Sequence, residues 1–233
     1  VAAVRAEDPA ARSSTPLPSW DDWVAETAVV AANSVAPASV SATALAHAGA
    51  PSVLAEYERA GALTQPEWIE VVDGVAGATE HGAVLGVALH AVLQESDLTV
   101  AGFDDRARAV AVGVGLVDVE RFVALARSAV EAEPVRRAAA LEFWQELQLA
   151  GRSPDGTTIV EGIADLVYRD DDGSLVVVDY KTDVGVSGET LEQYWTQVAV
   201  YADLLRREAG ERVSGLVLVF CRPGGARVLE RRL

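Results

Sequence analysis

The segment Val176-Val177-Val178-Asp179-Tyr180-Lys181-Thr182-Asp183 indicates both the fold and the chemistry of this chain. Its first residues are apolar and β-branched, which is typical of a buried strand. Side chains alternate between the two faces of a strand, so Asp179 and Lys181 lie on the same face. Opposite charges in an apolar strand are costly unless they bind a metal or a partner. The segment therefore predicts a buried strand that bears a functional site.

A second acidic strand precedes this segment. Residues 162–167 (GIADLV) place Asp165 in an apolar run, and the turn-rich stretch 170–174 (DDDGS) joins the two strands. A two-residue turn would send Asp165 and Asp179 to opposite faces of the sheet, whereas a loop of three or five residues would put them on one face. A shared site therefore predicts an odd-numbered loop or a bulge.

Two carboxylates on one face suit a hard divalent cation. Mg²⁺ and Mn²⁺ prefer oxygen ligands, so Asp165 and Asp179 are candidate ligands for either ion. Lys181 is expected to stay protonated beside Asp179 and to stabilise developing negative charge on a phosphate. The ordinary alternative is an ion-pair cluster on the protein surface.

Other candidate residues lie on predicted helices and on the first predicted strand. Gln197 and Tyr201 are four residues apart on a helix, so they share a face and can contact a phosphate or stack on a nucleotide. His90 lies inside an apolar helix and Glu146 on a strand. The ordinary alternatives are a core tyrosine, a core histidine and a solvated strand face.

Hydrophobic periodicity predicts an α/β protein whose N-terminal half is mostly helical. A small mixed β-sheet flanked by helices is expected in the second half. Helices are predicted over residues 20–33, 41–46, 79–95, 103–112, 117–130 and 191–208, and residues 128–140 are rich in Ala, Glu and Arg. Strands are predicted over residues 141–149, 157–168, 175–180 and 216–220. Residues 1–37 are predicted to form a linker or N-terminal arm with a short helix, and residues 38–233 the domain.

Composition restricts the possible functions. The formal net charge of −16 disfavours strong independent binding to DNA, but a metal site requires acids. No run of some 18 apolar residues occurs, so no membrane association is expected. The single cysteine, Cys221, excludes an internal disulfide and an iron–sulfur cluster, which favours a cytoplasmic setting. The start at Val1 and the absence of methionine indicate an excised fragment.

Four motifs together carry a family resemblance. They are Gly-x-x-x-His ending at His90, Gly-x-x-Asp-Leu containing Asp165, Asp-Tyr-Lys over 179–181, and Gln-x-x-x-Tyr ending at Tyr201. In this order they resemble the PD-(D/E)XK nuclease domain of the RecB/AddA family, found at the C-terminus of UvrD-like helicase–nuclease subunits. The resemblance covers the chain from about residue 40 onward and implies a restriction-endonuclease-like core.

The resemblance also implies roles for single residues. It assigns divalent-metal binding to His90, Asp165 and Asp179, and catalysis to the same two aspartates with Lys181. It assigns DNA contact to Gln197 and Tyr201. Two further residues are weaker candidates by their place in the motifs, namely Glu146 and Tyr180.

The implied activity is Mg²⁺- or Mn²⁺-dependent hydrolysis of single-stranded DNA by an exonuclease of the helicase–nuclease type, in double-strand-break processing in the bacterial cytoplasm. The chain has no Gly-x-x-x-x-Gly-Lys-Ser/Thr sequence, so the helicase motor is expected elsewhere in a longer chain. The expected protein partner is a second helicase–nuclease subunit. Two alternatives stay open: a catalytically silent nuclease fold that guides DNA or docks another subunit, and an acidic interaction domain.

Overall fold

The computed structural model describes residues 38–48, 80–154 and 156–233. Ala38–Leu233 forms one compact unit. The predicted arm over residues 1–37 and its short helix lie outside the described residues, so this part of the prediction stays untested. No helix in the described part of the chain is long and apolar enough to cross a membrane.

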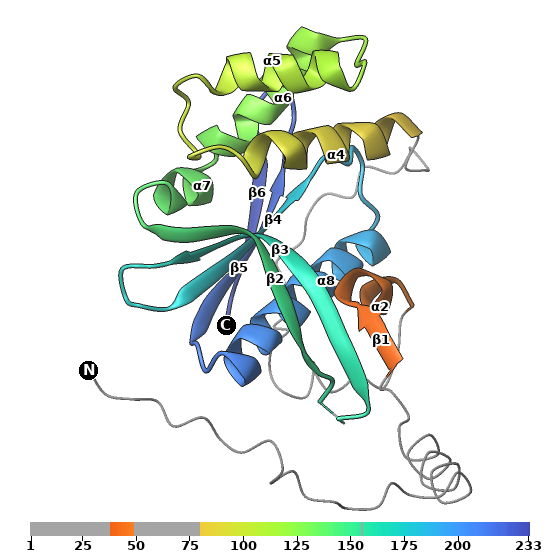
Figure 1. The fold of residues 1–233 in the computed structure, drawn as a ribbon, viewed down its shortest axis with the longest axis vertical. Coiled ribbons are helices and arrows are strands. Elements are labelled where there is room, and N and C mark those ends of the chain that lie inside the picture. Colours follow the sequence, from red (N-terminus) through yellow and green to blue (C-terminus); the bar gives the residue numbers. More distant parts are fainter. Residues whose placement is uncertain (1–37, 49–79, 155) are drawn as a thin grey trace, which may run out of the picture. The chain divides into compact units, whose positions relative to one another are not determined.

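A six-stranded mixed sheet forms the centre of the unit (Figure 1). Its strands run in the order β1-β3-β4-β5-β6, and β2 pairs with the other edge of β3. The β1–β3 and β4–β5 pairs are parallel, and the other pairs are antiparallel. The strands are β1 (Ala38–Ser41), β2 (Glu142–Arg152), β3 (Thr158–Arg169), β4 (Leu175–Lys181), β5 (Val213–Phe220) and β6 (Arg227–Arg232).

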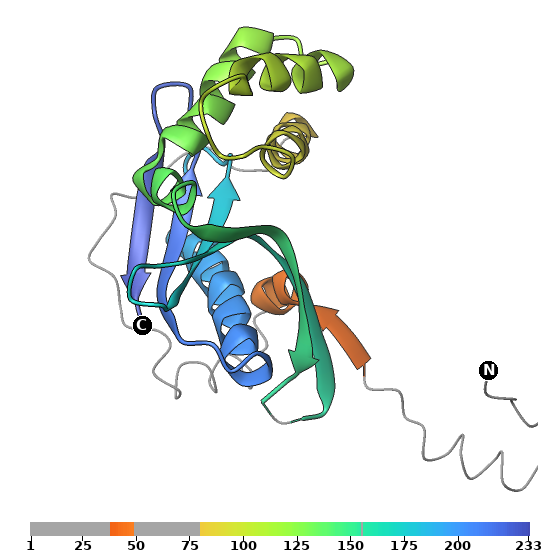
Figure 2. The same cartoon turned by 60° about the vertical axis from the view of Figure 1, so that its left-hand side comes forward.

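Helices cover both faces of the sheet, which confirms the predicted α/β class (Figures 1 and 2). One face packs against α2 (Ala42–Ala48) and α8 (Gly188–Glu208). The other face packs against four helices, namely α4 (Glu80–Leu93), α5 (Phe103–Gly113), α6 (Val119–Glu131) and α7 (Glu133–Ala138).

Strand β4 shows why the central strands are so apolar. Val177 lies in the hydrophobic cluster under α8, while Val176 and Val178 lie in the cluster under α4–α7. A strand that is buried on both faces needs apolar residues at every position rather than at alternate ones. The run of valines that ends at Asp179 follows from this double burial.

The Ala-, Glu- and Arg-rich segment 128–140 belongs to two helices. Helix α6 ends at Glu131 and α7 begins at Glu133, with Pro134 in its first turn. Proline cannot continue a helix because it lacks the main-chain N–H, but it suits the first turn of a new one. The sequence analysis also missed the short strands β1 and β6.

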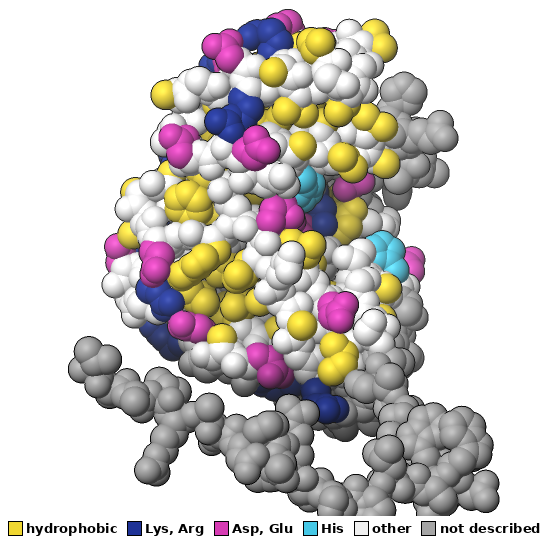
Figure 3. Space-filling view, in the orientation of Figure 1, with side chains coloured by type: hydrophobic (Ala, Val, Ile, Leu, Met, Phe, Trp, Pro, Cys, Tyr) yellow, Lys and Arg dark blue, Asp and Glu magenta, His cyan; other side chains and the backbone are white. Residues whose placement is uncertain are grey.

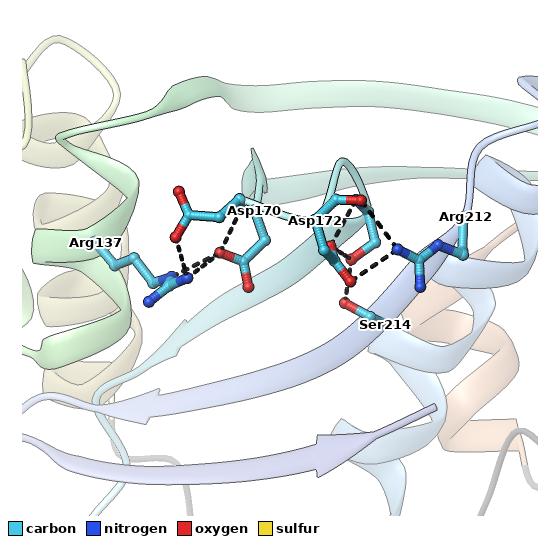
Figure 4. Close-up of polar contacts among 7 residues, drawn as sticks. Arg137, Asp170, Asp172, Arg212 and Ser214 are labelled. Carbon is cyan, nitrogen blue, oxygen red and sulfur yellow. Dashed lines mark hydrogen bonds and ion pairs between the residues drawn. The ribbon is translucent and has the colours of Figure 1, made fainter.

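The loop between β3 and β4 has five residues, Asp170–Ser174, so the predicted odd-numbered loop is confirmed. Ion pairs hold it on both sides: Arg137 of α7 contacts Asp170 at 2.5 Å, and Arg212 contacts Asp172 at 2.7 Å (Figure 4). The resulting register pairs Leu166 with Val178. Continued by one residue, it brings Asp165 opposite Asp179.

Strand β3 changes partners along one edge. Its residues 158–161 pair with β1, and its residues 166–169 pair with β4. Between these two pairings lie Gly162 and Asp165, next to the C-terminal end of β4. The candidate site lies at this interruption.

Candidate active site

Acidic, histidine and basic side chains gather beside α4 at the C-terminal end of β4 (Figure 3). The C-terminal half of α4 supplies His90, and the middles of β2 and β3 supply Glu146 and Asp165. The end of β4 supplies Asp179 and Lys181. Five side chains from four elements thus meet at one place.

His90, Glu146 and Asp165 form one group of possible metal ligands. The Nδ1 atom of His90 lies 3.4 Å from Oε1 of Glu146 and 3.5 Å from Oδ1 of Asp165. One ligand atom from each of the three lies within 4.8 Å of the others. This spacing allows a single cation to bind all three.

The main chain brings Glu146 into this group. Glu146 has a φ of 48°, in the left-handed region that side-chain-bearing residues rarely adopt. Next to it, Nε2 of Gln145 donates a hydrogen bond to the carbonyl of Leu93 at 2.6 Å. This bond ties β2 to the end of α4 and so holds His90 beside Glu146.

Asp165 is held by the neighbouring strand. The main-chain N–H of Tyr180 donates to Oδ2 of Asp165 at 2.8 Å. Burial, and then the negative charge of Asp179, raise the pKa of Asp165 well above its usual value, although the Tyr180 N–H opposes this shift. Without a bound cation, too little positive charge surrounds Asp165 to favour its ionised form.

Asp179 and Lys181 form a buried ion pair. Oδ2 of Asp179 lies 2.7 Å from Nζ of Lys181, and the aspartate is 1% exposed. The same oxygen makes no hydrogen bond of good geometry with any described residue. Burial lowers the pKa of Lys181, but the charge and hydrogen bond of Asp179, together with the charges of Asp165 and Asp183, more than offset this, so the pKa is raised and the ammonium is retained. This agrees with the expected protonated lysine.

A chain of hydrogen bonds holds Lys181 from the side of α8. Nζ of Lys181 donates to Oε1 of Gln197 at 3.2 Å. Nε2 of Gln197 donates to the hydroxyl of Tyr201 at 2.9 Å and to Oγ1 of Thr43 at 3.2 Å. Burial raises the pKa of Tyr201 to about 12, so its hydroxyl stays protonated. The network fixes the orientation of the Gln197 amide and the position of the Lys181 ammonium.

Gly162 makes room for this network. A Cβ atom at this position would lie 2.4 Å from Cε1 of Tyr201. The tyrosine ring therefore packs directly on the backbone of β3, where only glycine leaves space.

Two further tyrosines surround the site. The ring of Tyr194 lies 4.3 Å from Nζ of Lys181, and its hydroxyl donates to Oδ2 of Asp183 at 2.9 Å. Tyr180 is buried, and its ring meets that of His90 edge to face at 6.5 Å. The weaker candidate Tyr180 thus contributes through its main-chain N–H and through packing.

The structure groups the predicted residues differently from the expectation. His90 and Asp165 come together with Glu146, whereas Asp179 lies outside that group and pairs with Lys181. Metal binding by Asp179 therefore stays a prediction. Gln197 and Tyr201 are 9% and 2% exposed and contact Lys181 through Gln197, so their direct contact with DNA also stays a prediction.

The sequence analysis missed Thr43 and Asp183. Thr43 lies 154 positions before Gln197, and nothing in its local pattern indicates the contact. Asp183 lies two residues after Lys181, and the neighbouring acidic motif was the only signal that could have identified it.

The donor set fits a divalent cation. It offers carboxylate oxygens from Glu146 and Asp165, which suit Mg²⁺ and Mn²⁺, and one imidazole nitrogen, which suits a transition-metal ion better than Mg²⁺. The ionised form of Asp165, whose pKa is raised by burial and by the charge of Asp179, gains from an added positive charge.

Comparisons with known proteins identify the family of this chain. The chain is 30% identical over 217 residues to an ATP-dependent helicase/nuclease subunit of Desulforudis audaxviator (strain MP104C). That match covers 80% of this chain but 17% of the relative. The crystal structure of SSO0001 is similar at a TM-score of 0.34 and 16% identity, over 77% of this chain and 75% of that one. Residues 39–231 match the family model of the PD-(D/E)XK nuclease superfamily, and the chain belongs to this superfamily.

Proposed function

We propose that this domain is a divalent-metal-dependent deoxyribonuclease that hydrolyses phosphodiester bonds of single-stranded DNA. The observation that carries the proposal is the convergence of His90, Glu146 and Asp165 beside the Asp179–Lys181 ion pair. Acids that hold a cation next to a buried ammonium suit the cleavage of a phosphodiester, because the reacting group is negatively charged.

His90, Glu146 and Asp165 would hold Mg²⁺ or Mn²⁺, with Asp179 completing the site. Such an ion, when bound, supplies a hydroxide-like nucleophile from water and neutralises phosphate charge. The Tyr180 N–H fixes one oxygen of Asp165, and the other oxygen faces His90. The second carboxylate oxygen of Asp165 would therefore be available to the ion.

Lys181 would stabilise the negative charge that develops on the phosphate oxygens as the bond to the leaving oxygen breaks. Its ammonium is retained at neutral pH, and Gln197 and the Tyr194 ring fix its position. Preorganised charge of this kind contributes to catalysis because it needs no rearrangement during the reaction.

The biological setting is proposed from the relative. We place the domain in a bacterial, cytoplasmic helicase–nuclease that processes double-strand breaks, with motor domains in the same full-length chain and a second subunit. The net charge of −16 supports this arrangement, because DNA delivered by a motor needs no strongly basic nuclease surface.

The proposal is tested by Mn²⁺ titration and DNA cleavage of the wild type and of Asp165→Asn and Lys181→Ala. We expect calorimetry to show Mn²⁺ binding by the wild type and by Lys181→Ala, and weak or no binding by Asp165→Asn. Cleavage of single-stranded DNA should require both residues. Binding of Mn²⁺ without any cleavage by the wild type would instead indicate a catalytically silent nuclease fold.

A further inference from the structure

A row of side chains crosses three strands beside the candidate site. Lys181 of β4 is paired with Phe220 of β5, and Phe220 is paired with Arg227 of β6. Residues that are directly opposite in a sheet lie on the same face. Lys181 and Phe220 both lie on the α8 face, since Lys181 contacts Gln197 and Phe220 belongs to the cluster under α8. Arg227 therefore lies on that face as well.

The space between the two cations is aromatic. The Tyr194 ring lies 4.3 Å from Nζ of Lys181, and its centroid is 6.3 Å from that of Phe220. Positive groups that alternate with aromatic rings are typical of surfaces that bind single-stranded nucleic acid. Phe220 is 3% exposed, so the half-buried Tyr194 is the ring of this row that can stack on a base.

Arg227 lies at the end of this row, on the edge strand β6. It is exposed, and it forms no ion pair with any residue that the structure describes. Arg231, which lies further along the same face of β6, is buried and pairs with Glu192 at 3.0 Å. The charge of Arg227 is therefore available to an anion outside the fold.

The geometry points to Arg227 as a binding residue for a backbone phosphate of the single strand that reaches Lys181. This inference rests on the proposed function. Neighbouring strands lie about 4.8 Å apart, so the backbones at Lys181 and Arg227 are about 10 Å apart. A stacked strand rises about 3.4 Å per nucleotide. The contact would therefore fall within about three nucleotides of the phosphate beside Lys181.

The test uses Arg227→Gln and a matched control on the same strand, Arg232→Gln. Arg232 is also exposed, but it pairs with Gly215 at the opposite end of β6. Binding of a fluorescein-labelled oligothymidylate is measured by anisotropy in EDTA over a series of KCl concentrations. For Arg227→Gln we expect the slope of log affinity against log salt to become less negative by about 0.7, with about fivefold weaker binding near 0.1 M salt.

The Arg227→Lys variant keeps the charge and should keep the wild-type slope, and Arg232→Gln should leave both slope and affinity unchanged. An unchanged slope in Arg227→Gln, an equal loss in Arg232→Gln, or no binding by the wild type would each overturn the inference. A change of oligomeric state with an unchanged slope would assign Arg227 to protection of the sheet edge.

Cleavage with Mn²⁺ is measured in parallel so that the two proposals fail separately. Cleavage by the wild type with an unaltered slope in Arg227→Gln refutes the phosphate contact and leaves the nuclease proposal intact. The expected change in slope without any cleavage refutes the nuclease proposal and leaves the phosphate contact.

Discussion

The carboxylate of Asp165 accepts a hydrogen bond from the main-chain N–H of Tyr180 at 2.8 Å, so a side chain of β3 binds the backbone of β4 just before Lys181. The bond lies where the β3–β4 pairing has ended, after the Leu166–Val178 pair. Asp165 thus links β3 to β4 and also belongs to the candidate metal site. Any change at Asp165 is expected to affect both stability and metal binding.

The first prediction concerns the pH dependence of stability in the absence of metal. Burial and the charge of Asp179 raise the pKa of Asp165 in the folded state. A carboxyl group whose folded pKa is above its unfolded value of about 4 stabilises the fold below that value, and this contribution is lost as pH rises through the folded pKa. In EDTA, the free energy of unfolding should therefore fall as pH rises from about 4 toward neutral.

Urea unfolding of the wild type and of Asp165→Asn measures this effect. The difference in unfolding free energy between the two proteins should shift in favour of Asp165→Asn as pH rises. Saturating Mn²⁺ should restore the unfolding free energy of the wild type at neutral pH, because the ion favours the ionised carboxylate. Parallel curves for both proteins in EDTA would contradict the assigned pKa shift.

The second prediction concerns Lys181. Replacing it with alanine removes the ammonium that is paired with Asp179 at 2.7 Å. We expect single-turnover cleavage to fall by about 10²- to 10³-fold, which is typical for the loss of one preorganised charge-stabilising group. Mn²⁺ affinity measured by calorimetry should be retained, because the three grouped ligands remain.

Lys181→Arg provides the control for charge alone. A guanidinium is planar and larger than an ammonium, so it does not fit the same contacts with Gln197 and the Tyr194 ring, and cleavage should stay low. Full activity of Lys181→Arg would show that a positive charge without defined geometry is sufficient.

The sequence predicts features of the site that depend on neighbouring residues, and it does not predict contacts between residues that are far apart in the chain. The expectation of a shared site predicted an odd-numbered loop between the strands of Asp165 and Asp179, and the five-residue loop confirms it, because register follows from residue count. The left-handed backbone at Glu146 could not be predicted, since it arises where β2 meets α4 and β3. Thr43 shows the same limit: its partner, Gln197, is distant in sequence and is brought close by the fold.

The third prediction tests Thr43 as a positioning residue. Thr43→Val removes the oxygen that accepts the Gln197 amide, while Tyr201 keeps its own bond. A hydrogen bond of this kind contributes about 1 kcal/mol, which corresponds to about fivefold in kcat if it acts on the position of Lys181. The Mn²⁺ affinity and the melting temperature should change little. Thr43→Ser retains the hydroxyl and should retain kcat; an equal loss in both variants would assign Thr43 to packing.

The fourth prediction concerns the close approach of Gly162 and Tyr201. In Gly162→Ala the new Cβ would lie 2.4 Å from Cε1 of Tyr201, so the ring must move away from β3. Tyr201 is 2% exposed and bonded to Gln197, so it has little freedom to move. We expect a destabilisation of about 1–3 kcal/mol in urea unfolding, as for other overpacked core sites, together with a lower kcat.

Gly215→Ala is the matched strand control, because its nearest neighbour is a Val176 methyl group at an ordinary 3.5 Å. A double-mutant cycle then identifies the cause. In a Tyr201→Leu background the ring that clashes is gone, so Gly162→Ala should cost clearly less than it does in the wild type. An equal cost in both backgrounds would mean that β3 itself, rather than the tyrosine against it, requires glycine at this position.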